Sequence, residues 1–204
     1  MHLFFFSVRL CAVVGYGDAY VENRTYVPQY TEWARIGEIL DKIGNIAGYE
    51  FHFYAGSLKN ENIEICRKYE EQYDNFRFFV GIEHQELMNR LRGYDYGCEL
   101  YIEGDEPPDD ARVAYYFGSY HRNSIRNAFF DFINAGLPVI TTYASKMWEY
   151  LSEYDIVLKM TLTDLDLEFL RKNRKYYKDR SEVARRELCI DKAIPSLIQF
   201  FQEV

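Results

Sequence analysis

The chain has 204 residues, of which 48% are apolar and 27% are charged, and its formal net charge is −8. The apolar fraction is enough for a core, and the charged fraction is ordinary for a soluble protein. The acidic balance argues against nucleic acid as a partner, because sequence-independent binding needs a basic surface, although a local basic patch can still bind a phosphate.

Segments with strand character alternate with segments whose apolar residues recur at helical spacing. In chain order, the patterns predict a strand at 11–16, a helix at 30–47, a strand at 49–56, a helix at 60–73, a strand at 76–81, a short helix at 84–91, a strand at 94–102, a helix at 123–135, a strand at 137–142, a helix at 145–152, a strand at 154–160 and two closing helices at 163–177 and 180–202.

This alternation predicts βαβ units and a fold of the α/β class. We expect a single Rossmann-like domain over residues 1–204, with a parallel sheet of about six strands, helices on both faces and C-terminal helices. Residues 1–10 are interpreted as a leading strand or as an artificial start of the sequence. Ligands of such sheets bind at the carboxyl ends of the strands. The loops expected to hold a site are therefore 15–29, 56–60, 81–84, 103–122 and 141–146.

The four cysteines are widely separated and form no Cys-x-x-Cys pair, so the sequence indicates neither a zinc site nor a thioredoxin-type motif. They are Cys11, Cys66, Cys98 and Cys189. This usage fits a reduced, cytoplasmic compartment. The opening MHLFFFSVRLCAVVG is apolar but short, contains Arg9, and lacks a basic leading segment and a clear cleavage site. It is therefore interpreted neither as a signal peptide nor as a membrane span.

The segment HRNSIRNAFFDFINAGLPVI (121–140) carries the most informative pattern. At 100° per residue, a polar stripe lies opposite the apolar side chains; it consists of Asn123, Asn127, Asp131 and Asn134. Either Asn123 or Ser124 would cap the helix, where free backbone N–H groups point outward. Cationic or titratable side chains surround that end, namely His121, Arg122 and Arg126.

Free N–H groups, the positive end of a helix dipole and two arginines make a phosphate site. Asp131, two turns further on, is placed to accept hydrogen bonds from sugar hydroxyls. Phe130 lies beside the polar stripe and would face another domain or a nucleobase. The alternative interpretation is an ordinary amphipathic helix with a good cap.

The same segment resembles the signature of the nucleotide-sugar-binding, C-terminal half of GT-B glycosyltransferases of the group 1, or family 4-like, type. In a bacterial subset this signature reads approximately R-N-S-x-P-N-K-x-F-E-Y-x-x-x-G-x-P-V. Arg122, Asn123, Ser124, Asn127, Gly136, Pro138 and Val139 match it, and Asp131 stands where a second Glu is usual. Two departures are Arg126 for the Pro and Ala128 for the Lys. The missing Lys removes a charge that would help to hold a phosphate, and Arg126 could compensate.

Other segments, over about residues 11–200, are compatible with this resemblance. VVGYGDAYVENRTY resembles the glycine-containing loop after the first strand, which implies a donor-binding role for Gly15 and Gly17, with Arg24 as a diphosphate contact. FVGIEHQELMNRLRGYDYGCELY resembles a Gly-x-x-x-x-x-x-L segment followed by a strand. MWEYLSEYDIVLKM resembles the helix and strand after the signature.

The resemblance implies the donor-binding half of a hexosyltransferase-type enzyme. Such an enzyme transfers a sugar from a nucleotide-sugar to a glycan or lipid-linked acceptor, here with bacterial surface-polysaccharide synthesis as the setting. In this family the acceptor and, in inverting members, the catalytic base come mostly from the N-terminal half. A missing N-terminal domain or a partner subunit is therefore implied, and no catalytic residue is assigned. No cofactor or metal is expected, because side chains and a helix end hold the diphosphate.

Several alternatives remain open. The chain could be a non-catalytic module that keeps the fold and binds a nucleotide or a protein, which Ala128 and the absent half favour. GYGDAY (15–20) only partly matches G-x-G-x-x-G, because Tyr20 takes the place of the third glycine. DLD (164–166) could be a D-x-D metal motif, but after Thr163 a capping box is preferred. A flavodoxin-like domain would need a flavin loop, and a receiver-type domain would need an acidic phospho-acceptor pocket. The sequence shows neither.

Two surface features also have competing interpretations. His84 lies on the apolar side of its helix and is interpreted as a satisfied, half-buried histidine, with a base contact as the alternative. RKNRKYYKDR (171–180) is interpreted as a solvated helix face and turn. The alternative for this segment is a surface that meets anionic lipid, as a peripheral membrane contact, or the other domain.

Overall fold

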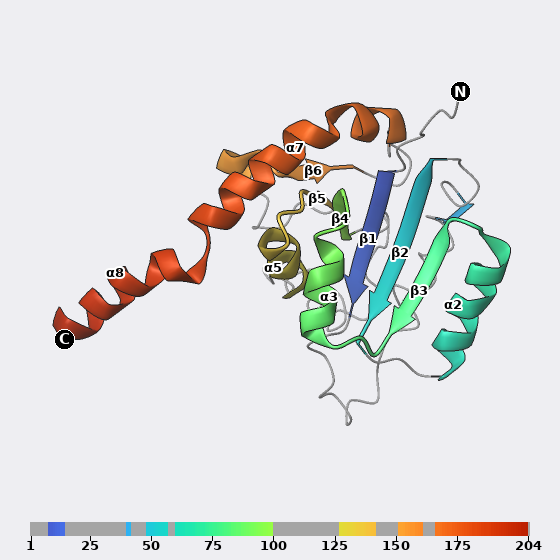
Figure 1. The fold of residues 1–204 in the computed structure, drawn as a ribbon, viewed down its shortest axis with the longest axis horizontal. Coiled ribbons are helices and arrows are strands. Elements are labelled where there is room, and N and C mark those ends of the chain that lie inside the picture. Colours follow the sequence, from blue (N-terminus) through green and yellow to red (C-terminus); the bar gives the residue numbers. More distant parts are fainter. Residues whose placement is uncertain are drawn as a thin grey trace, which may run out of the picture.

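A six-stranded parallel sheet forms the centre of the computed structural model, which describes residues 8–14, 40–41, 48–56, 60–99, 127–141, 151–160 and 166–203. The strand order is β3-β2-β1-β4-β5-β6, and all five pairings are parallel (Figure 1). This is the order of the doubly wound Rossmann fold, in which the direction of winding reverses between β1 and β4. The predicted α/β class is confirmed.

Each of the six predicted strands is present. They are β1 (Val8–Val14), β2 (Tyr49–Ala55), β3 (Phe76–Val80), β4 (Tyr96–Glu99), β5 (Val139–Thr141) and β6 (Val157–Lys159). The predicted start of the first strand was wrong, because Val8 already pairs with Tyr49. The fourth strand begins at Tyr96 rather than at residue 94, and residues 100–102 of the prediction lie outside the described residues. Asp95, which precedes it, hydrogen-bonds to both the backbone N and O of Arg9.

The helices agree less closely with the prediction. The described elements are α2 (Asn60–Gln72), α3 (His84–Leu91), α5 (Asn127–Asn134), a 3-10 turn η1 (Ser152–Tyr154), α7 (Leu167–Glu187) and α8 (Ile190–Glu203). Of the predicted helix at 30–47, residues 40–41 are described and helical. The predicted break at 177–180 was wrong. No glycine or proline interrupts this stretch, and buried Ser181 and Ala184 continue the inward face of α7.

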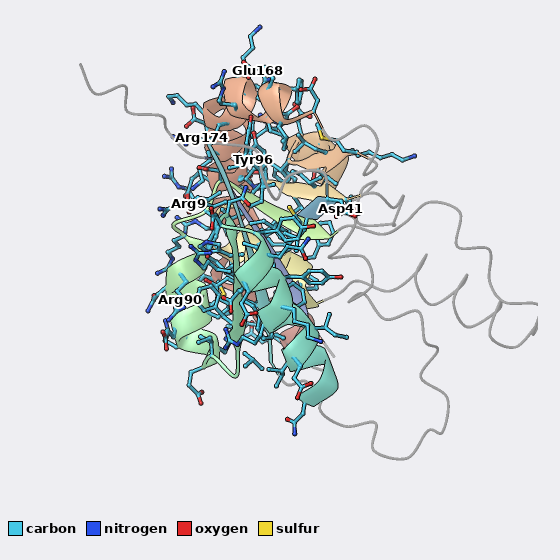
Figure 2. All side chains as sticks on the ribbon, turned by 90° about the vertical axis from the view of Figure 1, so that its right-hand side faces the viewer. Arg9, Asp41, Arg90, Tyr96, Glu168 and Arg174 are labelled. Carbon is cyan, nitrogen blue, oxygen red and sulfur yellow. The ribbon has the colours of Figure 1, made fainter. Side chains whose placement is uncertain are left out.

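Two apolar clusters cover the two faces of the sheet. One contains Phe51 and Phe53 of β2 with Cys66 of α2. The other contains Tyr54 of β2 with Leu87 of α3 and the apolar side chains of α5. Successive β2 side chains alternate between the clusters, as strand geometry requires. In Figure 2 the labelled arginines Arg9, Arg90 and Arg174 lie on one side of the sheet and Asp41 on the other.

Helix α7 crosses the amino ends of the strands and contributes to both clusters. Leu170 packs in the first cluster and Ala184 in the second. Tyr96 donates a 2.7 Å hydrogen bond to the Leu170 carbonyl, which ties the start of α7 to the sheet. Figure 1 shows α8 extending away from the sheet beyond α7. None of the described helices has the length and apolarity that a membrane crossing requires.

Candidate functional site

The carboxyl edge of the sheet brings α3 close to α5. After β3 the chain turns at Gly81, whose φ of +68° is readily adopted only by glycine. The Gly81 N–H donates to the carbonyl of Ala55 at 3.0 Å, and α3 then begins at His84. His84 therefore lies in the first turn of a helix at the edge where ligands of doubly wound sheets bind.

Helix α5 is anchored by its apolar side. Phe129, Phe132 and Ile133 are buried in the same cluster as Leu87 and Leu91 of α3. Gly97 of β4 allows this close packing. A Cβ at that position would lie 2.6 Å from Cδ1 and Cδ2 of the Phe132 ring, and closer still to Cγ. The glycine in β4 thus sets how near α5 lies to the sheet.

The C-terminal end of α5 is fixed by a Schellman motif. Gly136 has a φ of +71°, its N–H donates to the Ile133 carbonyl at 2.9 Å, and the Leu137 N–H donates to the Phe132 carbonyl at 2.9 Å. Pro138 follows, and its carbonyl accepts a hydrogen bond from Gly97 of β4. The Gly-x-Pro-Val turn in the sequence is therefore the connection that carries α5 directly into buried β5.

Asp131 and His84 form a polar contact between the two helices. His84 Nε2 and Asp131 Oδ1 are 3.0 Å apart, and 47 residues separate them in the chain. The Asp131 side chain is 13% exposed and the His84 side chain 61% exposed. The interpretation of His84 as half-buried was wrong: Leu87 and Leu91 supply the buried side of α3, and His84 extends from its end.

Most of the predicted donor-site residues lie outside the described residues. These are Gly15, Gly17, Arg24, His121, Arg122, Asn123, Ser124 and Arg126. Asn127 is the first residue of α5, but its side chain is among those not described. Asp131 is described, and its carboxylate lies one turn below the start of α5. The donor-site assignment therefore stays a prediction.

The contact of His84 with Asp131 was not predicted from the sequence. One signal was available: His84 falls in the loop 81–84, which was expected at the carboxyl edge. Phe130, predicted to lie beside the polar stripe, is 49% exposed. Its large apolar surface next to Asp131 is available to a ligand or to another domain.

A second polar cluster lies between β2 and the end of α3. The Nδ1 atom of His52 hydrogen-bonds to the Tyr94 hydroxyl, and the hydroxyls of Tyr54 and Tyr94 are 2.7 Å apart. Burial lowers the pKa of His52, an effect that nearby Glu50 opposes. A neutral imidazole with its proton on Nε2 can accept at Nδ1 from the Tyr94 hydroxyl, and either tyrosine hydroxyl can donate to the other. This network connects β2 to the loop before β4.

The acidic motif at 164–166 is structural in its described part. Asp166 is the N-cap of α7, and its Oδ1 accepts a 2.9 Å hydrogen bond from the Phe169 N–H. The cap is therefore one helical turn later than a Thr163 capping box would place it. Within the described ranges, no three His, Cys, Asp or Glu side chains are grouped as metal ligands.

The chain is similar in fold to several solved structures. The chain matches the structure entitled GtfA/B complex over 97% of its own length and 36% of the other chain, with a TM-score of 0.56 and 10% identity. It matches the pneumococcal O-GlcNAc transferase GtfA, in complex with UDP and GlcNAc, with the same four values. WaaG, a glycosyltransferase involved in lipopolysaccharide biosynthesis, matches 89% of this chain and 42% of its own, with a TM-score of 0.51 and 14% identity.

The chain has the fold of a GT-B half-domain, that is, of one of the two domains that make up the GT-B fold. Identities this low establish the GT-B fold and nothing finer. No protein-family profile matches the sequence. No curated protein matches it either. The chain spans less than half of each matched GT-B chain, between 36% and 42% of those three.

Proposed function

We propose that this chain is the donor-binding half of a glycosyltransferase that transfers a sugar from a nucleotide-sugar to a glycan or lipid-linked acceptor. The observation that carries the proposal is the position of Asp131, on a GT-B half-domain fold, at the carboxyl edge of the sheet. There its carboxylate is 13% exposed and hydrogen-bonded to His84. A carboxylate so placed can accept hydrogen bonds from hydroxyls of ribose or of the donor sugar.

The chemistry requires a stabilised leaving group. Transfer breaks the bond between the sugar and the nucleoside diphosphate, and negative charge grows on the diphosphate. Asn123, Ser124 and Arg126, just before α5, would donate hydrogen bonds to it, and the helix dipole favours the same charge. Because these hydrogen-bond donors and the Arg126 cation can stabilise the negative charge on the diphosphate, we propose no metal and no cofactor.

The proposed partner is the acceptor-binding half, either on the same polypeptide or on another subunit. The extents of the matched chains support this, since each is more than twice as long as the part that this chain covers. The likeness to WaaG, a glycosyltransferase involved in lipopolysaccharide biosynthesis, favours bacterial surface-polysaccharide synthesis as the setting. The cysteine usage favours a cytoplasmic location. A non-catalytic module with the same fold is the second candidate, favoured by Ala128 where the resembled signature has a lysine.

Titration calorimetry with UDP, GDP, ADP and CMP tests the proposal. We expect saturable binding of one nucleotide, weakened at least about tenfold by Asp131→Asn, because a hydrogen bond to a charged group contributes about 1.5–3 kcal/mol. Arg126→Ala should also weaken it. Asp74→Asn is the matched control, because Asp74 is exposed just before β3, at the opposite edge of the sheet.

The outcomes test the donor site, which a module that binds only a protein would lack. Binding that Asp131→Asn weakens and Asp74→Asn leaves unchanged supports the donor site. Binding that is equal in all variants contradicts the assignment of Asp131. Absence of saturable binding to all four nucleotides favours the non-catalytic module.

A further inference from the structure

The contact between His84 and Asp131 joins two helices that are each held rigidly by apolar packing. On α3, Leu87 and Leu91 are fully buried. On α5, Phe129 and Phe132 are buried against the same cluster. Neither backbone needs to move for the side chains to meet. The two backbones are therefore held where Nε2 and Oδ1 can meet, and the two atoms are 3.0 Å apart.

The contact uses only one oxygen of the carboxylate. No residue that the structure describes donates a hydrogen bond to Asp131 Oδ2, although Oδ1 is engaged. A free aspartate side chain can rotate about its Cβ–Cγ bond, a torsion with a broad profile. The hydrogen bond from His84 removes that freedom and holds Oδ2 in one direction. Preorganisation of this kind lowers the entropy cost of binding a ligand.

Stability alone is a weak reason for this pair. The His84 side chain is 61% exposed, and exposed ion pairs contribute little to folding. The Asp131 side chain, in contrast, is almost buried, so its carboxylate has lost much of its hydration. The hydrogen bond from His84 replaces part of that hydration. The pair lies at the carboxyl edge of the sheet, where ligands of this fold bind.

We propose that His84 is a positioning residue of the donor site, which holds the Asp131 carboxylate so that Oδ2 accepts a hydrogen bond from a ribose hydroxyl of the nucleotide. This inference rests on the proposed function. It adds a residue on α3, outside the segment that resembles the glycosyltransferase signature, and it makes ribose rather than the base the group that the pair recognises. Discrimination between ribonucleotides and 2′-deoxyribonucleotides should then depend on His84.

Three substitutions at one position separate the hydrogen bond from other effects. Glutamine places an N–H donor near the position of the histidine Nε2. Asparagine is shorter and places its donor near Nδ1 instead, and alanine has no donor. We expect His84→Ala and His84→Asn to weaken binding of the ribonucleotide about three- to tenfold, the range that one net hydrogen bond provides. His84→Gln should restore affinity to within about twofold of the unmodified protein.

The measurement is titration calorimetry of each variant with UDP and 2′-deoxy-UDP, or with whichever ribonucleotide binds and its deoxy form. The unmodified protein should prefer the ribonucleotide, and His84→Ala should lose most of that preference. Because the His84 side chain is largely exposed, water can take its place beside Asp131 in His84→Ala, and the thermal midpoint should hardly change. A purely structural role predicts the opposite, a lower midpoint with an unchanged ratio of affinities, and would overturn the inference.

Failure of this inference is distinguishable from failure of the proposed function. If a nucleotide binds and Asp131→Asn weakens binding while His84→Ala does not, the donor site stands and His84 has no positioning role. If His84→Gln is as weak as His84→Ala, the Nε2 hydrogen bond is not the cause and the inference is overturned. If no nucleotide binds to the unmodified chain, both are overturned for this chain.

Discussion

Replacement of Gly97 by alanine should destabilise the protein by forcing α5 away from β4. A Cβ at residue 97 would lie 2.6 Å from two carbons of the Phe132 ring, whereas carbon atoms pack at about 3.5 Å. The ring must therefore retreat by about 1 Å or leave its rotamer. Phe132 is fully buried, so neither movement is free. Overpacking of this kind costs about 1–3 kcal/mol, which for a chain of this size lowers the thermal midpoint by about 2 to 12 °C.

Urea unfolding followed by circular dichroism measures the free energy of unfolding of Gly97→Ala and of a matched control. The control is Gly93→Ala, because the nearest atom to its added Cβ is the Arg90 carbonyl oxygen at 3.2 Å, and no side chain blocks it. The double variant Gly97→Ala/Phe132→Leu should lose less stability than the sum of its single variants, since removal of the ring opens the space. Additive losses, or equal effects at Gly97 and Gly93, would refute the packing argument.

Two further predictions concern buried polar groups. Burial lowers the pKa of His52, so as the pH falls the unfolded chain is protonated at this residue before the folded protein is. The contribution of His52 to the free energy of unfolding is therefore constant above about pH 6.5 and falls below it, with a slope of up to about 1.4 kcal/mol per pH unit. Urea unfolding between pH 7.5 and 5 should show this slope and should lose it in His52→Gln, whereas an unchanged slope would assign it to other groups. Tyr96→Phe removes the hydrogen bond to the Leu170 carbonyl and should cost about 0.5–1.5 kcal/mol, the net contribution of one hydrogen bond. Tyr176→Phe, at an exposed tyrosine, should cost about 0.5 kcal/mol or less by the same urea unfolding, and equal losses for the two would contradict this reasoning.

The strands were predictable because each is a short apolar run bounded by turn residues, and these are local signals. The run YEFHFYAG, for example, corresponds to β2 (Tyr49–Ala55). The order of strands in the sheet is not a local property. No order was predicted from the sequence; the rule that alternating elements form parallel sheets predicted only that the strands would be parallel. The end of α7 was missed, because nothing local marks Leu188 as a better stop than Lys178.

The candidate site was predictable only in part, because its contacts join distant segments. Asp131 was expected on a polar, solvent-facing stripe, yet it is 9% exposed, since His84 of α3 covers it. His84 was assigned to an apolar face from the spacing of its own helix. That spacing cannot show that the first turn extends past the core to reach another helix. In the same way, nothing near His52 in sequence indicates its contact with Tyr94.

Hydrogen exchange followed by mass spectrometry, with and without saturating nucleotide, locates the bound ligand on the chain. We expect slower exchange at 81–91 and 127–134, which contain α3 and α5, and unchanged exchange at 60–72, which contains α2. Protection of α2 with no change at α3 and α5 would place the nucleotide away from the carboxyl edge beside His84 and Asp131, and would contradict the donor site proposed for this chain.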